Sequence, residues 1–345
     1  ERMRGSRPAL KEQIEDKINS VSEFFHLYNG VHLLSWLAAT NVFADPETYK
    51  ESTHKGRECF VEYALSLATA SALAIDSGES PDDKSLIEFG NAIAQVYDLV
   101  QTFYITEESE TPHPKAEGEM RFLSLIRHLW SRGDSYEAHH REMYTGLLAP
   151  HDAFLCQHYG LTGAEVLTAF DEVRLQIATN FAPILETHLL LRELHDHFKQ
   201  FVEGGEAKTA TTFEEIRQAY HNLPEVQKCL ERISLLEEPK EKLFKLMPNK
   251  NMPAHILDLL SCTCGDNSAF VGMPKYSGWP LNETILRRRP IVKVKDAYYC
   301  FLPQGLFRNL VNIGESLIAE ADVKYFRKQY SKARSDFLEE KSLNY

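Results

Sequence analysis

Two acidic residues near the end of the chain, Glu339 and Glu340, are followed by Lys341, so the sequence there contains a Glu-x-Lys triplet. Nucleases that use Mg²⁺ hold the metal ion with a pair of carboxylates and use a lysine to stabilise charge or to position water. Those groups normally sit on paired strands, with an aspartate well upstream. Here the triplet falls at the end of an expected helix, so by itself it is not a complete catalytic motif.

The helix expected over 322–342 has two distinct faces. Apolar side chains recur at i, i+4, i+7 and i+11, while lysines recur every four residues on the opposite side. A line of lysines neutralises backbone phosphates without reading sequence, so this face is a candidate nucleic-acid contact. An ordinary solvated face on a docked helix is the alternative interpretation. The apolar stripe is Phe326, Tyr330, Ala333 and Phe337, and the candidate contact residues are Lys324, Arg327, Lys328, Lys332 and Arg334.

Positive charge is concentrated in the last part of an acidic chain. Between residues 285 and 334 eleven basic residues face four acidic ones, which gives +7 in a chain of net charge -12. The remainder therefore carries -19. This balance argues against nucleic-acid binding by the whole surface, but it allows a local basic face.

Metal-ligating residues occur without a recognised metal-binding spacing. A histidine and glutamate cluster spans 186–197, but it lacks the HExxH pattern that places two imidazoles and a base on one helix face. Cys262 and Cys264 lack a second close pair of ligands for a structural zinc site. We therefore predict no metal ligands here and expect solvated or hydrogen-bonded histidines. Phosphate-binding glycine loops, GxSxG elbows and catalytic cysteine constellations are also absent from the sequence.

The composition is ordinary for a soluble chain. Apolar residues make up 43% and charged residues 26% of the 345 residues, and no window approaches the roughly 18 apolar residues of a membrane span. The N-terminus lacks an initiator Met and a signal-peptide pattern, so we expect an excerpt of a longer protein without a leader. Six cysteines in mostly apolar surroundings indicate free thiols in a reducing compartment. We therefore expect a cytoplasmic location and no membrane contact.

Helical periodicity dominates the chain up to residue 260. Apolar spacing of three and four predicts helix over 8–40, with a possible break near Asn29-Gly30. Ser80 is the expected N-cap of the next long helix, with Pro81 at its first position. Thr162 and Thr212 each open a capping box with a glutamate three residues later. Pro183 is expected to kink or break the helix that follows Thr162.

The pattern changes after Leu260. A stretch rich in glycine, proline, asparagine and serine predicts turns, and alternation at period two over 290–303 predicts a β-hairpin that turns near Asp296-Ala297. This hairpin is the only clear strand pair in the sequence, and helices at about 304–319 and 322–342 follow it. We therefore predict a mainly α fold. Its expected divisions are an α-helical scaffold (1–205), a small helical domain (206–260) and a loop, hairpin and helix region (261–345).

The segment from Leu243 to Tyr345 resembles the lead-in to PD-(D/E)XK-type nuclease domains of bacterial restriction or phage-defence proteins. The matching residues of an Arg-x-x-x-hydrophobic-Glu pattern are Arg334, Leu338 and Glu339, with Glu340 as the neighbouring choice. The resemblance implies a catalytic role for Glu339 or Glu340 and Mg²⁺ as the cofactor. The Asp and (D/E)-x-K strand of such a domain are expected beyond Tyr345.

Three functions follow as hypotheses. The first is the scaffold or regulatory part of a nuclease whose core performs metal-dependent phosphodiester hydrolysis, with nucleic acid as the partner of the basic helix. The second is a non-enzymatic helical module that binds a protein partner or a second copy of itself through its acidic surface. The third is a metal- or small-molecule-binding helical bundle built on residues 186–197.

Overall fold

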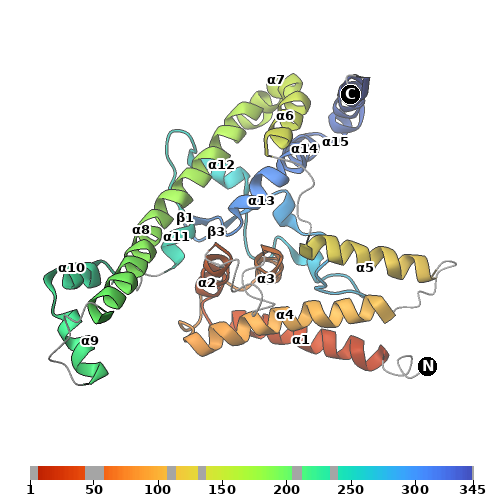
Figure 1. Cartoon of the computed structure of the whole chain (residues 1–345). Coiled ribbons are helices and arrows are strands. Elements are labelled where there is room, and N and C mark those ends of the chain that lie inside the picture. Colours follow the sequence, from red (N-terminus) through yellow and green to blue (C-terminus); the bar gives the residue numbers. More distant parts are fainter. Residues whose placement is uncertain are drawn as a thin grey trace.

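The computed structural model describes residues 7–42, 58–106, 114–130, 137–203, 212–233 and 240–343, and these form a mainly α fold, as predicted (Figure 1). Five helices form the N-terminal part, and a small sheet with two short helices occupies the centre. A long helix, α8 (Gly163–Glu203), packs beside the sheet and extends away from the rest of the described molecule. Within the described residues no helix is long and apolar enough to cross a membrane.

The first two helices, α1 (Arg7–Leu27) and α2 (Gly30–Val42), are separated where the sequence predicted a break. Asn29 donates its backbone N–H to the Glu79 carbonyl (2.8 Å), and its side-chain oxygen accepts from the His32 N–H (3.1 Å). A Cβ at Gly30 would lie 2.8 Å from the Phe25 ring, so glycine is required for this close approach. Helix α1 packs along α4 (Asp83–Thr106), and α4 packs on α5 (Pro114–Trp130).

The N-cap of α4 is Asp82, so the prediction of Ser80 was wrong. The Asp82 carboxylate accepts from the Ser85 N–H (2.8 Å), which satisfies one unpaired donor of the first turn and places negative charge at the positive end of the helix. The Ser80 hydroxyl contacts His32 Nδ1 instead (3.1 Å). Pro81 therefore precedes the helix and does not lie at its first position.

Helix α8 (Gly163–Glu203) is the longest element of the described chain and follows α6 (Glu137–Leu148), η3 (Ala149–His151) and α7 (Asp152–Tyr159). The capping box at its start is confirmed, because Thr162 N–H donates to the Glu165 carboxylate (2.7 Å) and Glu165 N–H donates to the Thr162 hydroxyl (3.3 Å). No break occurs at Pro183. Its ring lies on the exposed side of the helix, so the proline removes one backbone hydrogen bond without a clash in the core.

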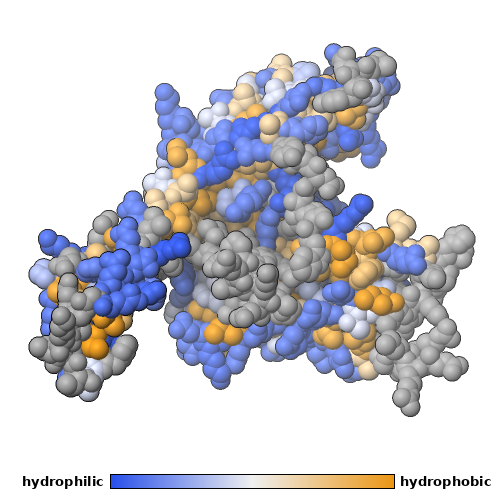
Figure 2. Space-filling model, viewed as in Figure 1, coloured by the Kyte–Doolittle hydropathy of each residue, from blue (hydrophilic) through white to orange (hydrophobic). Residues whose placement is uncertain are grey.

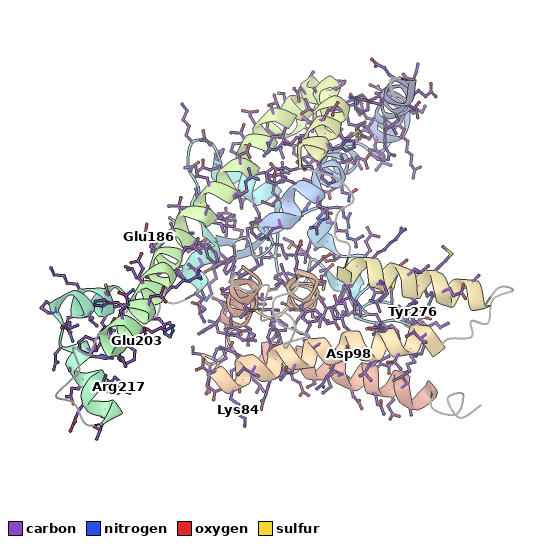
Figure 3. The ribbon with its side chains drawn as sticks, viewed as in Figure 1. Lys84, Asp98, Glu186, Glu203, Arg217 and Tyr276 are labelled. Atoms are coloured by element: carbon purple, nitrogen blue, oxygen red, sulfur yellow. The ribbon has the colours of Figure 1, made fainter. Side chains whose placement is uncertain are left out.

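The distal half of α8 forms an arm with α9 (Phe213–His221) and α10 (Pro224–Ile233). The predicted capping box of Thr212 and Glu215 opens α9. The arm has its own small core, made of Phe201, Tyr220 and Val226, which is distinct from the main core. Glu186 and Glu203 on α8 and Arg217 on α9 lie along the arm (Figure 3), and hydrophilic residues cover most of its near face (Figure 2).

The central sheet contains the predicted hairpin, β3 (Ile291–Val294) and β4 (Ala297–Tyr299), paired antiparallel. The chain turns at Lys295 and Asp296, and Lys295 adopts a left-handed φ of 54°. Two further strands, which were not predicted from the sequence, extend the hairpin to a four-stranded sheet. Strands β1 (Lys245–Leu246) and β2 (Ser261–Cys262) flank the hairpin in the order β1-β4-β3-β2, and two-residue strands are too short to show a period in the sequence.

Short helices connect and follow the strands. Around the sheet lie α11 (Glu241–Phe244), α12 (Ala254–Leu259), η5 (Ser268–Phe270) and η6 (Ile285–Arg287). The helix predicted at 304–319 is divided at Asn309 into α13 (Pro303–Arg308) and α14 (Leu310–Ala321). The helix predicted at 322–342 comprises α15 (Val323–Tyr325), the π-helical turn η7 (Phe326–Tyr330) and α16 (Ser331–Leu343).

One hydrophobic core includes residues from Ile14 to Tyr330. It joins the N-terminal helices, the first half of α8, the sheet and α14, so the described parts of the first and last predicted divisions share their packing. The boundaries at 205 and 260 stay a prediction. Buried Trp279 illustrates the sharing, because its ring packs edge-on against Phe103 of α4 at a centroid distance of 5.0 Å.

Candidate anion-binding site

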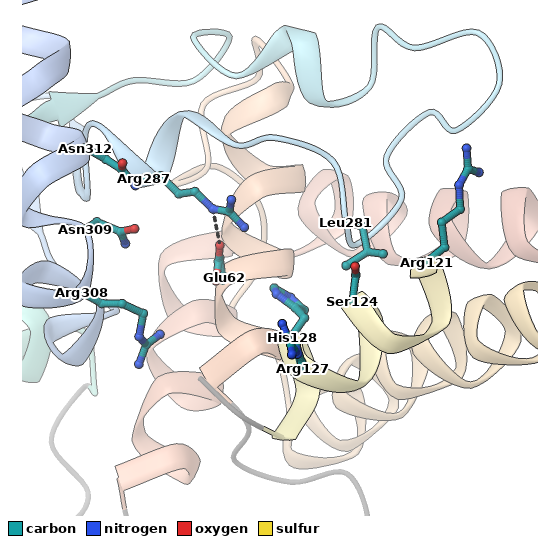
Figure 4. Close-up of a pocket in the computed structure, with 10 residues that line it drawn as sticks. All are labelled: Glu62, Arg121, Ser124, Arg127, His128, Leu281, Arg287, Arg308, Asn309 and Asn312. Atoms are coloured by element: carbon teal, nitrogen blue, oxygen red, sulfur yellow. Dashed lines mark ion pairs between the residues drawn. The ribbon is translucent and has the colours of Figure 1, made fainter. Parts of the chain in front are cut away.

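An open cleft of about 650 Å³ lies between α5, α3 and the start of α14 (Figure 4). Four arginines from three separate elements line it, and Glu62 on α3 (Glu58–Ala70) is the acidic residue among the described lining side chains. The remaining lining residues are His128, Leu281 and uncharged polar residues. The arginines are Arg121, Arg127, Arg287 and Arg308.

Helix α5 supplies one wall of the cleft. Arg121, Ser124 and His128 line the cleft from this helix at spacings of three and four residues, which places them along one face. Arg127, three residues after Ser124, lines the cleft from the edge of that face. Leu125 lies four residues after Arg121 and three before His128, so it is their neighbour on the helix surface, and its full burial anchors this side of α5 to the core. Arg127 is exposed, and no described residue forms an ion pair with it.

Arg287 is positioned by a buried polar network that connects η6 to α3. Asn267 donates to the Ser66 carbonyl (2.9 Å), and its side-chain oxygen accepts from the Ile285 N–H (2.9 Å). Thr284 caps η6 and accepts from the Ser66 hydroxyl (2.9 Å). Buried polar groups that are hydrogen-bonded in this way hold a turn rigidly. Arg287 is thereby placed above Glu62.

The ion pair between Arg287 and Glu62 is loose. The Arg287 Nε atom lies 3.9 Å from Glu62 Oε1, and 47% of the Arg287 side chain is exposed. The Glu62 side chain is only 16% exposed, but a contact of this length to a half-exposed arginine is weak. Arg287 therefore retains donors directed at the cleft, as Figure 4 shows.

Arg308 is held more firmly, at the last turn of α13. Its two terminal nitrogens donate to the two oxygens of Glu58, at 2.8 and 3.0 Å. This bidentate geometry is the strong form of an arginine and carboxylate pair. Glu58 neutralises part of the charge of Arg308 from behind the cleft and fixes the direction of its guanidinium group.

His128 packs against Tyr97. The Tyr97 hydroxyl donates to the Cys59 carbonyl (3.0 Å), and His128 Nε2 lies 3.2 Å from the same hydroxyl. The two rings are stacked, with an interplanar angle of 13°. These contacts hold the His128 ring at the wall of the cleft.

The cleft suits anions. Among the described residues, four guanidinium groups lie at the cleft with two carboxylates, those of Glu62 in its lining and of Glu58 paired with Arg308, so these groups together carry a net positive charge. Guanidinium groups bind phosphate and carboxylate oxygens through two parallel hydrogen bonds. Arginines converging from separate elements are pre-organised for such a ligand, because the fold and not the ligand brings them together.

The predicted nucleic-acid residues lie elsewhere, on the last helix. Tyr330 is fully buried and Tyr325 stacks on Phe154 at a centroid distance of 3.9 Å, so the apolar side of this helix is docked. Arg334 forms an ion pair with Glu315, with 3.2 Å between Arg334 Nε and Glu315 Oε1, and half of its side chain is exposed. None of the five predicted contact residues lines the arginine cleft. The other four are also exposed, and they are Lys324, Arg327, Lys328 and Lys332.

Glu339 and Glu340 are exposed on α16. Lys341 forms an ion pair with Glu142 of α6 and therefore serves in docking the helix. Adjacent positions on an α-helix point about 100° apart, so these two glutamates do not converge on one ion. Mg²⁺ does not fit the residues present here, and we derive no metal-dependent step from them. The catalytic roles stay a prediction.

Two residues of the groups considered as metal ligands, His197 and Cys262, have structural contacts. His197 Nδ1 lies 3.3 Å from the Tyr220 hydroxyl, and the Cys262 thiol lies 3.5 Å from the Ile291 carbonyl. Burial raises the pKa of Cys262 to about 12. Among the described residues no three histidine, cysteine or acidic side chains are grouped to hold a metal ion. The His188 side chain lies outside the described part of the chain.

Sequence reasoning missed the contribution of α5. It found Arg287 and Arg308 as part of the basic C-terminal stretch, but not Arg121, Arg127 and His128. A signal was present, because the polar residues at 121, 124 and 128 share one helix face. That spacing also fits any solvated helix, so only the fold distinguishes a binding face from an ordinary solvated face. No family model, curated protein or solved structure matches the chain.

Proposed function

We propose that this chain is a helical module that binds a phosphate-bearing ligand in the arginine cleft. The observation that carries the proposal is the convergence of Arg121, Arg127, Arg287 and Arg308 from three elements on one cleft of about 650 Å³. A purely structural cluster would pair its arginines with acids. Here Arg127 has no acidic partner among the described residues and Arg287 has only a 3.9 Å contact.

The wider proposal is that the module is the scaffold or regulatory part of a nuclease-type protein. The exposed residues Lys324, Arg327, Lys328 and Lys332 would contact nucleic-acid phosphates, and phosphodiester hydrolysis would come from a core outside residues 1–345. The support is the resemblance of residues 243–345 and the exposed basic face of a docked helix. Ligand binding in the cleft is then a regulatory or sensing event of the same protein.

Titration of the chain with inorganic phosphate and with a nucleoside 5′-monophosphate tests the central proposal. Arg127→Gln and Arg287→Gln each remove one guanidinium group that is exposed, so the fold should be kept. We expect each variant to lose about tenfold in affinity, the equivalent of one charge-assisted contact. Arg217→Gln, on the arm and paired with its neighbour Glu214 (3.4 Å), is the matched control. Equal affinity in all three variants would contradict the proposal.

A second function, protein binding, is favoured by the arm. Helices α9 and α10 are held on the distal half of α8 by a separate small core, which extends this surface away from the main body (Figure 1). A non-enzymatic interaction module would use such an extension to reach a partner or a second copy. Sedimentation of the chain with and without residues 212–233 distinguishes self-association through the arm from a monomer.

A further inference from the structure

We infer that the ligand of the arginine cleft is a chain of phosphoryl groups, as in a nucleoside triphosphate or inorganic tripolyphosphate, and not a single phosphate. This inference rests on the proposed function and adds the class of ligand to it. It follows from how the charge is distributed, from the size of the cleft and from the chemistry of the uncharged residues that line it.

The positive charge is spread along the cleft. Figure 4 shows Arg287 and Arg308 entering from one side, Arg127 with His128 near the middle, and Arg121 at the opposite end. Arg121 and Arg127 are six residues apart on α5, which corresponds to about 9 Å along the helix axis. A single phosphate cannot contact guanidinium groups at both ends. A chain of phosphoryl groups presents negative charge over the same length.

The orientation of Arg121 is also fixed. One of its terminal nitrogens donates to the Tyr276 hydroxyl (2.6 Å), and its guanidinium carbon lies 4.9 Å from the centre of the Tyr276 ring. Arginine stacked in this way loses little further freedom when a ligand binds. The end of the cleft farthest from Arg308 is therefore pre-organised as well.

The volume leaves room for a ligand larger than one small ion. A cleft of about 650 Å³ falls in the range of about 300–1,000 Å³ that holds drug-sized ligands and cofactors. A phosphate ion alone would leave most of it filled with water. A phosphoryl chain with an attached polar group fills more of it and uses the arginines at both ends.

The uncharged lining favours such a compound over a nucleic-acid strand. Ser124, Asn309 and Asn312 supply hydroxyl and amide groups, and Leu281 is the aliphatic side chain among the described lining residues. Grooves that bind single strands combine positive charge with aromatic rings on which bases stack. Apart from the His128 imidazole, no aromatic ring is found among the described residues of this lining. The cleft is thus built for phosphoryl groups and polar atoms.

Calorimetric titration of the whole chain in a buffer containing EDTA tests the inference. The ligands are phosphate, pyrophosphate, tripolyphosphate, a nucleoside triphosphate, the unphosphorylated nucleoside and a single-stranded decanucleotide, all at one ionic strength. We expect affinity to rise about tenfold with each added phosphoryl group, as one more guanidinium contact forms. Comparison of tripolyphosphate with the nucleoside triphosphate shows whether the organic part is also recognised.

Variants locate the binding along the cleft. Arg127→Gln should weaken phosphate and tripolyphosphate alike, whereas Arg121→Gln should weaken tripolyphosphate about tenfold and leave phosphate unchanged. Melting temperatures establish that both variants are folded. Equal affinity for phosphate and tripolyphosphate, or tighter binding of the decanucleotide than of the triphosphate at the same site, would overturn the inference while the proposed function stands. Absence of binding by every ligand would overturn both.

Discussion

Arg308 donates two hydrogen bonds to Glu58, at 2.8 and 3.0 Å, although 250 residues separate them in the sequence. The pair joins α13 to the start of α3, and both side chains are mostly shielded, with 28% and 16% exposed. It therefore connects the C-terminal region to the N-terminal helices at the edge of the cleft.

Glu58→Gln should lower the free energy of unfolding. The variant keeps the shape of the side chain but replaces a charge-assisted bidentate contact, so we expect a loss of about 1–3 kcal/mol in urea denaturation. Glu88→Gln is the matched control, because the Glu88 pair with Lys84 spans 3.7 Å between exposed side chains. Its loss should stay below about 0.5 kcal/mol. Equal losses in the two variants would show that the Arg308 pair is no stronger than a surface contact.

Glu62→Gln should strengthen anion binding. Glu62 is the acidic residue among the described lining side chains, and it lies 3.9 Å from Arg287. Removing its charge eliminates repulsion of an incoming anion and releases Arg287, so we expect a several-fold gain in phosphate affinity, equivalent to about 1 kcal/mol. Glu283→Gln, which changes the same charge outside the cleft, is the control. An unchanged affinity would place the anion away from Glu62.

The local parts of this architecture could be predicted from sequence, and the cleft could not. Two features were readable from the local sequence because they depend on residues within a few positions of each other. They are the capping box of Thr212 and Glu215 and the hairpin at 291–299. The N-cap of α4 was missed because Ser80 and Asp82 are both good caps. The choice depends on His32, a residue of another helix that contacts Ser80.

The cleft depends on contacts between distant segments. Arg121 and Arg287 are 166 positions apart, and nothing in either local pattern indicates that they face the same space. The buried network of Ser66, Asn267 and Thr284 determines where Arg287 lies, and it is itself tertiary. Charge counting found the basic stretch, but the fold decides which of its residues share a site.

Gly314→Ala should destabilise the protein. Alanine is favoured over glycine inside a helix by about 1 kcal/mol. At Gly314, however, a Cβ would lie 2.9 Å from both Leu148 and Tyr144 on the facing helix α6. Overpacking of this kind costs about 1–3 kcal/mol, so the cost of the clash should exceed the gain in helix propensity.

Gly90→Ala on α4 is the control for this prediction. A Cβ there would lie 3.4 Å from the Trp36 ring, which is close to ordinary contact. We expect its melting temperature to be unchanged or slightly raised, and that of Gly314→Ala to fall. A stabilised Gly314→Ala variant would mean that α6 and α14 separate more easily than their packing indicates.

The stability should decrease as pH falls through the range in which histidine titrates. Burial lowers the pKa of His151, whose Nδ1 lies 2.9 Å from the Tyr325 hydroxyl and whose Nε2 is buried without a described partner. A histidine whose folded pKa is lowered is protonated first in the unfolded chain. Stability present above pH 6.5 is therefore lost as pH falls below that value.

Denaturation at pH 7.5 and pH 5.5 measures this loss. His151→Gln should reduce the difference between the two pH values, because glutamine does not titrate. Part of the difference should persist, since burial lowers the pKa of His140 as well, with the neighbouring His139 and Arg308 charges acting in the same direction. An undiminished difference in His151→Gln would assign the pH dependence to other groups.

Tyr220→Ala should unfold the end of the arm without unfolding the main body. Tyr220 is buried in the small core with Phe201 and Val226, and its hydroxyl donates to the Leu194 carbonyl (2.7 Å). The small core and the main core share no residue among those described, so disrupting the small core should leave the packing of the main core intact. Hydrogen exchange should show loss of protection over 213–233 and near-unchanged protection over α4. Tyr97→Ala, in the main core, should instead lower protection globally. A global loss in Tyr220→Ala would show that the arm and the body unfold as one cooperative unit.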